Sequence, residues 1–418
     1  MKMFKDIRLC FMSNNKSCYS TLRLMSKIGL RFFLLLLVVS PLFFQGILFS
    51  QLESLYRSGT IKMVADSGFG LKTDWSKLFF DMNKSITIAP DGSLFISNNR
   101  QHNITKISAS GQVLKTFGQK GMGTTDVNFP QRLSILDQKY LVVGENSTLR
   151  RISMFDLTGK FAKLLRTNHS CYSPVALKDN RIAYFSKKMD KKNGYKCTVW
   201  IKDIVLGKET EVMSVNLVRS DIIRLSNNSA LTVGNHGGEM ILERTLEGNL
   251  LVGISDRPDI QIYSSQGKFL HSFRVNITPL PITNKYTDAY KQAIIEEMSI
   301  GQGTSGLMHF VKKTSFANLF PTKFPYYRNI MVDSKGNILI FKWLDCVKEC
   351  PVIFQAYSAP GAFIKEVQLD MGPFALEISS LWQNLIFTER GLFAYVQIKG
   401  DEDCNPKIIK IKVPANSK

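Results

Sequence analysis

The chain has 418 residues, of which 44% are hydrophobic and 21% are charged, so its composition excludes a disordered polymer and supports a full-sized core. Lysine and arginine total 54 against 34 acidic residues, a formal net charge of +20, which favours anionic partners. The basic residues are mostly dispersed, and no nucleic-acid-binding motif occurs, so the composition disfavours a nucleic-acid-binding protein. A solvated basic surface is the simplest interpretation of the charge.

The N-terminal region contains a targeting segment. Residues 32–49, FFLLLLVVSPLFFQGILF, carry no charge and follow Lys27 and Arg31. A basic stretch before an apolar one predicts a signal peptide, although these eighteen residues also reach the lower length limit of a membrane span. We expect residues 1–50 to be a leader, with a signal peptide favoured over an anchor that contacts the membrane through residues 32–49. Residues 51–418 would then be exported: periplasmic, on the cell surface or secreted.

Short β-rich runs separated by turn residues recur from about residue 78. The clearest unit, residues 85–118, has the sequence SITIAPDGSLFISNNRQHNITKISASGQVLKTFG. The Asp91-Gly92 and Ser110-Gly111 turns separate alternating runs, which indicates hairpins. The unit therefore predicts four antiparallel strands in succession, and this is the plan of one β-propeller blade.

Four further units repeat this plan, with first strands that begin at or near residues 132, 173, 240 and 328. The last part of the chain supplies only three runs, NLIFTE, GLFAYVQI and KIIKIKVP. The run IKMVADS at 61–67 is available as the missing strand, and its addition would remove an exposed sheet edge. The sequence thus predicts an all-β fold, a β-propeller with six blades.

Three stretches carry a resemblance to a known family. APDGSLFISN at 89–98, the link from Phe117-Gly118 to Phe129-Pro130, and FPYYRNIMVDSKGNILIF at 324–341 resemble the NHL repeat. Over roughly residues 60–415 the chain is similar to the exported six-bladed β-propellers of bacteria that contain NHL-like repeats. This resemblance implies a fold and a compartment, but no reaction, because the architecture serves scaffolds, receptors, lyases and hydrolases alike.

Residues 279–325 interrupt the strand rhythm between blades four and five. Within them, TDAYKQAIIEEMS has the apolar spacing of a helix, with Thr287 as the expected N-cap. A helix beside a propeller face would either gate the central opening or buttress two blades. The buttress is the simpler interpretation.

Five cysteines follow the leader, in segments that we expect on one propeller face: Cys171, Cys197, Cys346, Cys350 and Cys404. An oxidising compartment permits disulfides among them, and the odd number leaves at least one unpaired within the chain. Cys171 and Cys197 come from one blade and are a candidate pair, as are two of the other three. Zinc binding by those three is disfavoured because structural zinc prefers four ligands.

Two features predict anion binding. Arg132 and Arg328 each open a predicted innermost strand, so we expect both guanidinium groups at the channel mouth, where they would hold an anion bidentately. The stretch KKMDKKNGYK is the most basic local segment, with one acidic residue among its lysines, which include Lys187, Lys188, Lys191 and Lys192. Surface ion pairing and a solubilising loop are the simpler alternatives.

His236 and Glu239, in GNHGGE, are the best-placed candidates for a calcium or zinc site at the channel. No G-x-S-x-G, P-loop or H-E-x-x-H motif occurs. The sequence therefore favours an exported, non-enzymatic binding or scaffold module without a cofactor, recognising a protein, a glycan or another anionic ligand. The alternative is a metal-dependent hydrolase or lyase with its site in the central channel.

Overall fold

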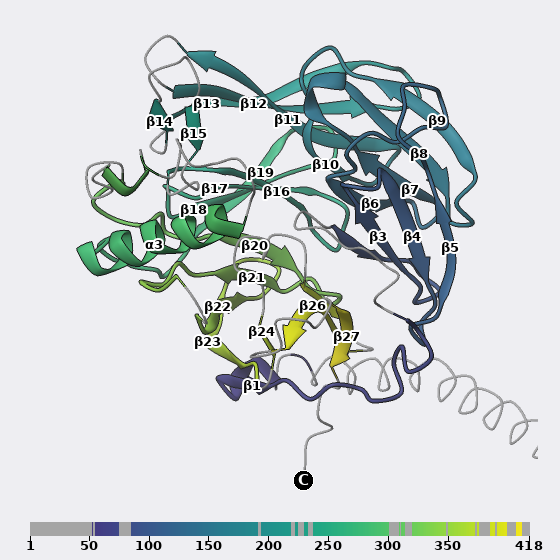
Figure 1. Ribbon diagram of the computed structural model, residues 1–418. Helices are drawn as coiled ribbons and strands as arrows, with labels where there is room; N and C mark the ends of the chain where they lie inside the picture. Colours follow the sequence, from purple (N-terminus) through teal and green to yellow (C-terminus); the bar gives the residue numbers. More distant parts are fainter. Residues whose placement is uncertain are drawn as a thin grey trace, which may run out of the picture. The chain divides into compact units, whose positions relative to one another are not determined.

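The computed structural model divides the chain into two compact units, Met1–Ser54 and Leu55–Lys418 (Figure 1). It describes Leu52, His309 and residues 55–74, 85–190, 194–218, 222–224, 230–232, 237–300, 311–313, 320–347, 350–372, 374–375, 385–388, 391–398 and 407–411. The predicted leader, residues 1–50, lies outside these residues. Within the described part of the chain, no helix has both the length and the apolar character that a membrane crossing requires.

The second unit contains five four-stranded antiparallel blades among the described residues, and in each blade the strands follow one another in chain order (Figure 1). Blade 1 comprises β2 (Ile86–Ile88), β3 (Leu94–Asn98), β4 (Asn103–Ile107) and β5 (Val113–Phe117). Blade 2 comprises β6 (Arg132–Leu136), β7 (Tyr140–Gly144), β8 (Arg151–Asp156) and β9 (Phe161–Arg166). Blade 3 comprises β10 (Tyr172–Ala176), β11 (Arg181–Asp190), β12 (Gly194–Asp203) and β13 (Glu209–Val218).

Blade 4 comprises β16 (Met240–Arg244), β17 (Leu250–Ile254), β18 (Asp259–Tyr263) and β19 (Phe269–Arg274). Blade 5 comprises β20 (Asn329–Val332), β21 (Ile338–Phe341), β22 (Val352–Tyr357) and β23 (Phe363–Asp370). The first strands of neighbouring blades contact each other in the order β2, β6, β10, β16 and β20. The prediction of an all-β propeller with five complete units is confirmed.

The blades share a packing motif at their outer edge. In blades 1, 2, 4 and 5 the register of the last two strands shifts by one residue near the final turn. This bulge pairs the first residue of the outer strand with a large residue on the third strand, as in Phe161 with Phe155 and Phe363 with Tyr357. A bulge changes the direction of the side chains beside it. Its recurrence at the same place in four blades shows that they share a structural repeat, although the sequence similarity between them is weak.

The hydrophobic core lies between the blades. Phe95 and Ile104 of blade 1 pack with Leu133 and Leu141 of blade 2, and equivalent clusters join blades 2 and 3, 3 and 4, and 4 and 5. Turns reinforce these contacts: Gly159, with φ of +81°, lies where a Cβ atom would come within 2.7 Å of the Phe117 ring. Each blade therefore needs its neighbours in order to bury its faces, as expected of a repeat fold.

The strands after blade 5 do not form a regular blade. β24 (Phe374–Ala375), β25 (Leu385–Thr388) and β27 (Lys407–Ile411) all pair with β26 (Gly391–Ile398). This sheet contacts blade 5, where the Phe354 and Phe387 rings lie 5.6 Å apart, and blade 1, through Ile408. The expectation of six blades is corrected to five, because the described residues of this part of the chain do not repeat the regular four-strand meander. A further two-stranded sheet, β14 (Ile222–Arg224) and β15 (Ala230–Thr232), was not predicted.

The predicted strand at 61–67 is found in a different role. β1 (Thr60–Lys62) pairs in parallel with β23 of blade 5, and Ala65 alone forms an antiparallel bridge with Ile411. The preceding turn is held by Tyr56, whose buried hydroxyl donates to Asp333 Oδ2 over 2.7 Å. The segment thus links blade 5 to the last sheet instead of completing that sheet as a full strand.

The predicted helix is present after blade 4 as α3 (Asn284–Ile300) (Figure 1). It begins four residues earlier than expected, because Thr283, not Thr287, caps it: the Tyr286 amide donates to Thr283 Oγ1 over 3.1 Å. Thr287 is buried in the first turn, where its hydroxyl donates to the carbonyl of Asn284.

Candidate functional site

The first strands of blades 2 and 4 are joined by two arginine contacts. Arg132, which opens β6, forms an ion pair with Glu243 of β16 through a short hydrogen bond from Nη2. In return, Arg244 of β16 donates from Nη1 to the carbonyl of Ile135 in β6, over 3.1 Å. The Arg132 and Glu243 side chains are only 13% and 19% exposed. Because first strands line the centre of a propeller, we call these two contacts the channel strut.

Arg328 has different surroundings from Arg132. Its backbone amide donates to the carbonyl of Phe341, and its guanidinium carbon lies 5.0 Å from the centre of the Trp343 ring. Burial lowers the pKa of Arg328 to about 10, although Tyr286 of α3 and Glu239 act to raise it. Arg132 therefore belongs to the channel strut and Arg328 packs on Trp343. That the two arginines hold one anion at a channel mouth stays a prediction.

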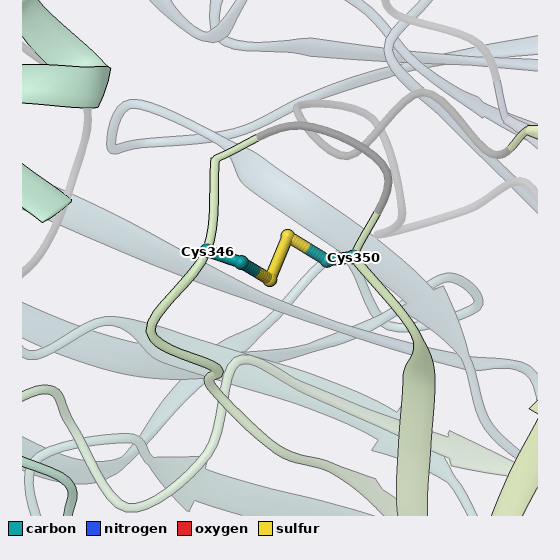
Figure 2. The surroundings of a disulfide bond; sticks show 2 residues. All are labelled: Cys346 and Cys350. Atoms are coloured by element: carbon teal, nitrogen blue, oxygen red, sulfur yellow. A yellow bond between two sulfur atoms is a disulfide. The ribbon is translucent and has the colours of Figure 1, made fainter.

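The disulfide lies in the loop that holds the start of α3. Cys346 is bonded to Cys350, which confirms a pair among the predicted cysteines (Figure 2). The neighbouring Asp345 accepts hydrogen bonds from Thr283 Oγ1 over 3.0 and 3.2 Å. In the same loop, the Trp343 ring stacks on Phe324 at 5.5 Å.

Aromatic contacts continue from this loop to the helix, because Tyr286 of α3 meets the same Phe324 ring edge-on at 4.8 Å. These links bind α3 to blade 5 and to residues 320–327. They support the expectation of a buttress.

The other predicted cysteine pair is wrong. Cys171 and Cys197 are free thiols, 2% and 0% exposed. Cys171 belongs to the core between blades 2 and 3, whereas Cys197 belongs to the core between blades 3 and 4, so the sheet of blade 3 separates them. Burial raises the pKa of both thiols. Cys404 lies outside the described residues.

The basic segment expected as a loop is largely strand. β11 and β12 each run for ten residues, and only a short connection at 191–193, which includes Lys191 and Lys192, lies outside the description. Lys187 Nζ lies over the rings of Tyr172, Phe185 and Tyr195, at 5.2, 5.5 and 5.8 Å from their centres. Lys188, the next residue, is exposed and lies on the other face of the sheet. The predicted lysine group is therefore divided between two faces.

Only one residue of the predicted metal pair, Glu239, belongs to the described part of the chain. His236 lies outside the described residues, and the backbone amide of Glu239 donates to Ser255 Oγ over 2.8 Å. Among the residues that the structure describes, no three or more histidine, cysteine, aspartate or glutamate side chains are grouped so as to hold a metal ion.

One buried ion pair was missed by sequence reasoning. Arg151 and Glu145 are fully buried, and Glu145 Oε2 accepts from Arg151 Nε at 2.8 Å, Arg151 Nη2 at 2.6 Å and the Asn128 amide at 2.7 Å. The other carboxylate oxygen accepts from the Ser153 hydroxyl. Arg151 Nη2 also donates to the carbonyl of Gly121, so the pair fastens the link from blade 1 to blade 2. The only sequence sign is a glutamate and an arginine on either side of a short polar turn.

Part of the basic excess has a structural use. Lys115 of blade 1 donates to the carbonyl of Thr158 in blade 2 over 3.3 Å, and Lys163 of blade 2 donates to the carbonyl of Ile204 in blade 3 over 3.2 Å. Outer-strand lysines thus brace the turn of the following blade. Their charge is consequently weak support for an anionic partner.

Neither a family model nor a curated protein sequence matches the chain. Among solved structures, a member of the DUF4221 family from Bacteroides vulgatus is 10% identical, with a TM-score of 0.49, and the match covers 84% of this chain and 98% of that one. A Bacteroides fragilis protein, described as an inferred exported protein, is 12% identical with a TM-score of 0.46, and the match covers 81% of this chain and 88% of that one. A streptogramin B lyase is 10% identical, with a TM-score of 0.41 and coverage of 79% and 84%.

We assign the propeller fold from the strand pairing and register of this chain. Similarity at this level of identity does not transfer function from one protein to another. The predicted NHL-like repeat is not confirmed, since no family model matches.

Proposed function

We propose that this protein is an exported, non-enzymatic module that binds an anionic partner on a face of its propeller. The observation that carries the proposal is the channel strut. A reaction centre in the channel would need several acidic, amide or imidazole groups that converge on an open position. Between blades 2 and 4, the carboxylate of Glu243 is instead neutralised by Arg132, and Arg244 is bonded to a backbone carbonyl.

Export is supported by two independent features. The apolar segment at 32–49 follows a basic stretch, as in a signal peptide. The disulfide between Cys346 and Cys350 is of the kind that persists in an oxidising compartment and is rare in the cytosol. We therefore assign the propeller to the outside of the cytoplasm.

Metal analysis of the purified full-length chain tests the choice between a binding module and a metal-dependent hydrolase or lyase. After gel filtration in buffer without chelator, we expect no stoichiometric calcium or zinc by mass spectrometry. A matched Glu243→Gln variant serves as the control for the channel. One equivalent of metal in the wild type that is lost in this variant would overturn the proposal, because Glu243 would then be a metal ligand.

A further inference from the structure

The long hairpin of blade 3 carries an unusual row of side chains. Its β11 and β12 strands have ten residues each, against five and six in β7 and β8 of blade 2. The face toward blade 2 packs through Ile182 and Tyr184, near one end of the hairpin. Further along that face, Lys188, Lys196 and Asn216 are exposed.

The strand register places these residues in two rungs that cross three strands. Lys188 is opposite Lys196, which is opposite Asn216, and the adjacent rung is Ser186, Thr198 and Ser214. The Thr198 and Ser214 hydroxyls are hydrogen bonded at 2.8 Å. We call these six residues the lysine face.

Two like charges in direct register are unfavourable for the fold. Opposite residues on antiparallel strands have Cβ atoms about 5 Å apart, and like charges there are destabilising. Neither Lys188 nor Lys196 forms an ion pair with an acidic side chain of the described residues. An anionic group placed between them would remove this repulsion and gain two charge-assisted hydrogen bonds.

We propose that the lysine face binds an acidic polysaccharide, with a carboxylate between Lys188 and Lys196 and sugar hydroxyls on the exposed side chains of Ser214 and Asn216. This inference rests on the proposed binding function and assigns its place and ligand class. A polysaccharide is favoured over a protein because both rungs are polar throughout, whereas protein interfaces depend on buried aromatic and apolar anchors. The hairpin residue Met189, 68% exposed, belongs to the opposite face by strand alternation.

Binding of oligogalacturonate to the full-length chain, measured by calorimetry at low salt, tests this assignment. We expect the double substitution Lys188→Gln and Lys196→Gln to weaken binding about tenfold, because charged contacts dominate attraction to a polyanion. The matched control Lys268→Gln removes an exposed lysine of blade 4 and is expected to change binding less than about twofold. Lys188→Glu places opposite charges in register, so it should abolish binding while raising the melting temperature, which separates lost binding from lost folding.

Three results would overturn the assignment. These are no binding of oligogalacturonate, binding that the double substitution leaves unchanged, and tighter lysine-dependent binding of poly-glutamate, which would identify an acidic polypeptide as the partner. Size analysis of the sugar after the titration shows whether only the lysine face is wrong as the binding site or whether the proposal of a non-enzymatic module is wrong as well. Shortened oligogalacturonate would show an enzyme, whereas intact but unbound sugar would leave the non-enzymatic module in place and refute the lysine face alone.

Discussion

Glu145 offers the sharpest test of how the blades are held together. Its carboxylate is fully buried and accepts hydrogen bonds from Arg151, Ser153 and the Asn128 amide. Glu145→Ala would leave the Arg151 guanidinium buried without its counter-charge. Removing one partner of a buried ion pair typically costs about 3–5 kcal/mol, because the remaining charge stays desolvated.

The expected change in melting temperature follows from the size of the unit. Unfolding entropy near 60 °C is roughly 2.1 cal/mol/K per residue. For the unit from Leu55 to Lys418, each 1 kcal/mol then corresponds to about 1.3 °C. Glu145→Ala should therefore lower the melting temperature by about 4–7 °C.

Differential scanning calorimetry measures this change, with Glu366→Ala as the matched control. Glu366 is 42% exposed and pairs with Lys342 over 2.9 Å, so its removal should cost at most about 1 kcal/mol, or roughly 1.3 °C. A decrease below about 2 °C for Glu145→Ala would show that Arg151 and Glu145 do not form a buried ion pair, because a buried arginine without its partner is strongly destabilising.

Three further outcomes are expected. Burial raises the pKa of the Cys171 and Cys197 thiols, so at about pH 8 iodoacetamide should label both in urea and neither in the native protein, as mass spectrometry would show. Native labelling would contradict the packing between the blades. A double-mutant cycle of Arg132→Ala and Glu243→Ala should give a coupling of about 1–2 kcal/mol by thermal unfolding, and additive effects would show that the channel strut is absent. Reduction of the disulfide should speed hydrogen exchange in α3 and leave blade 1 unchanged; unaltered exchange in α3 would refute its attachment to that loop.

The repeated blades could be predicted because their determinants are local. Asp91-Gly92 and Ser110-Gly111 set hairpin turns between runs that alternate in polarity, and Gly92 and Gly111 do adopt positive φ. The insertion helix also has a local period. Its cap was misplaced because Thr283 and Thr287 are equally good caps by sequence, and the contact with Asp345, far along the chain, favours Thr283.

The contacts that define the candidate sites are not local, and no sequence pattern indicates them. Glu243 lies 111 residues from Arg132, so no spacing rule connects the two halves of the channel strut. The fate of β1 depends in the same way on the free edge of β23, which a sequence pattern does not specify. The length of β11 and β12 could not be predicted either, because a lysine-rich segment is typical of a loop. Only the pairing of Lys188 with Lys196 on the next strand shows that the segment is part of a sheet.

Hydrogen exchange of the full-length chain with and without oligogalacturonate tests most directly the claim that binding occurs on a blade face and not in the channel. We expect protection of β11, β12 and β13 on binding, with exchange in β6 and β16 unchanged. Protection of β6 and β16 with no effect on the blade 3 hairpin would place the ligand at the channel strut and contradict binding on the blade face.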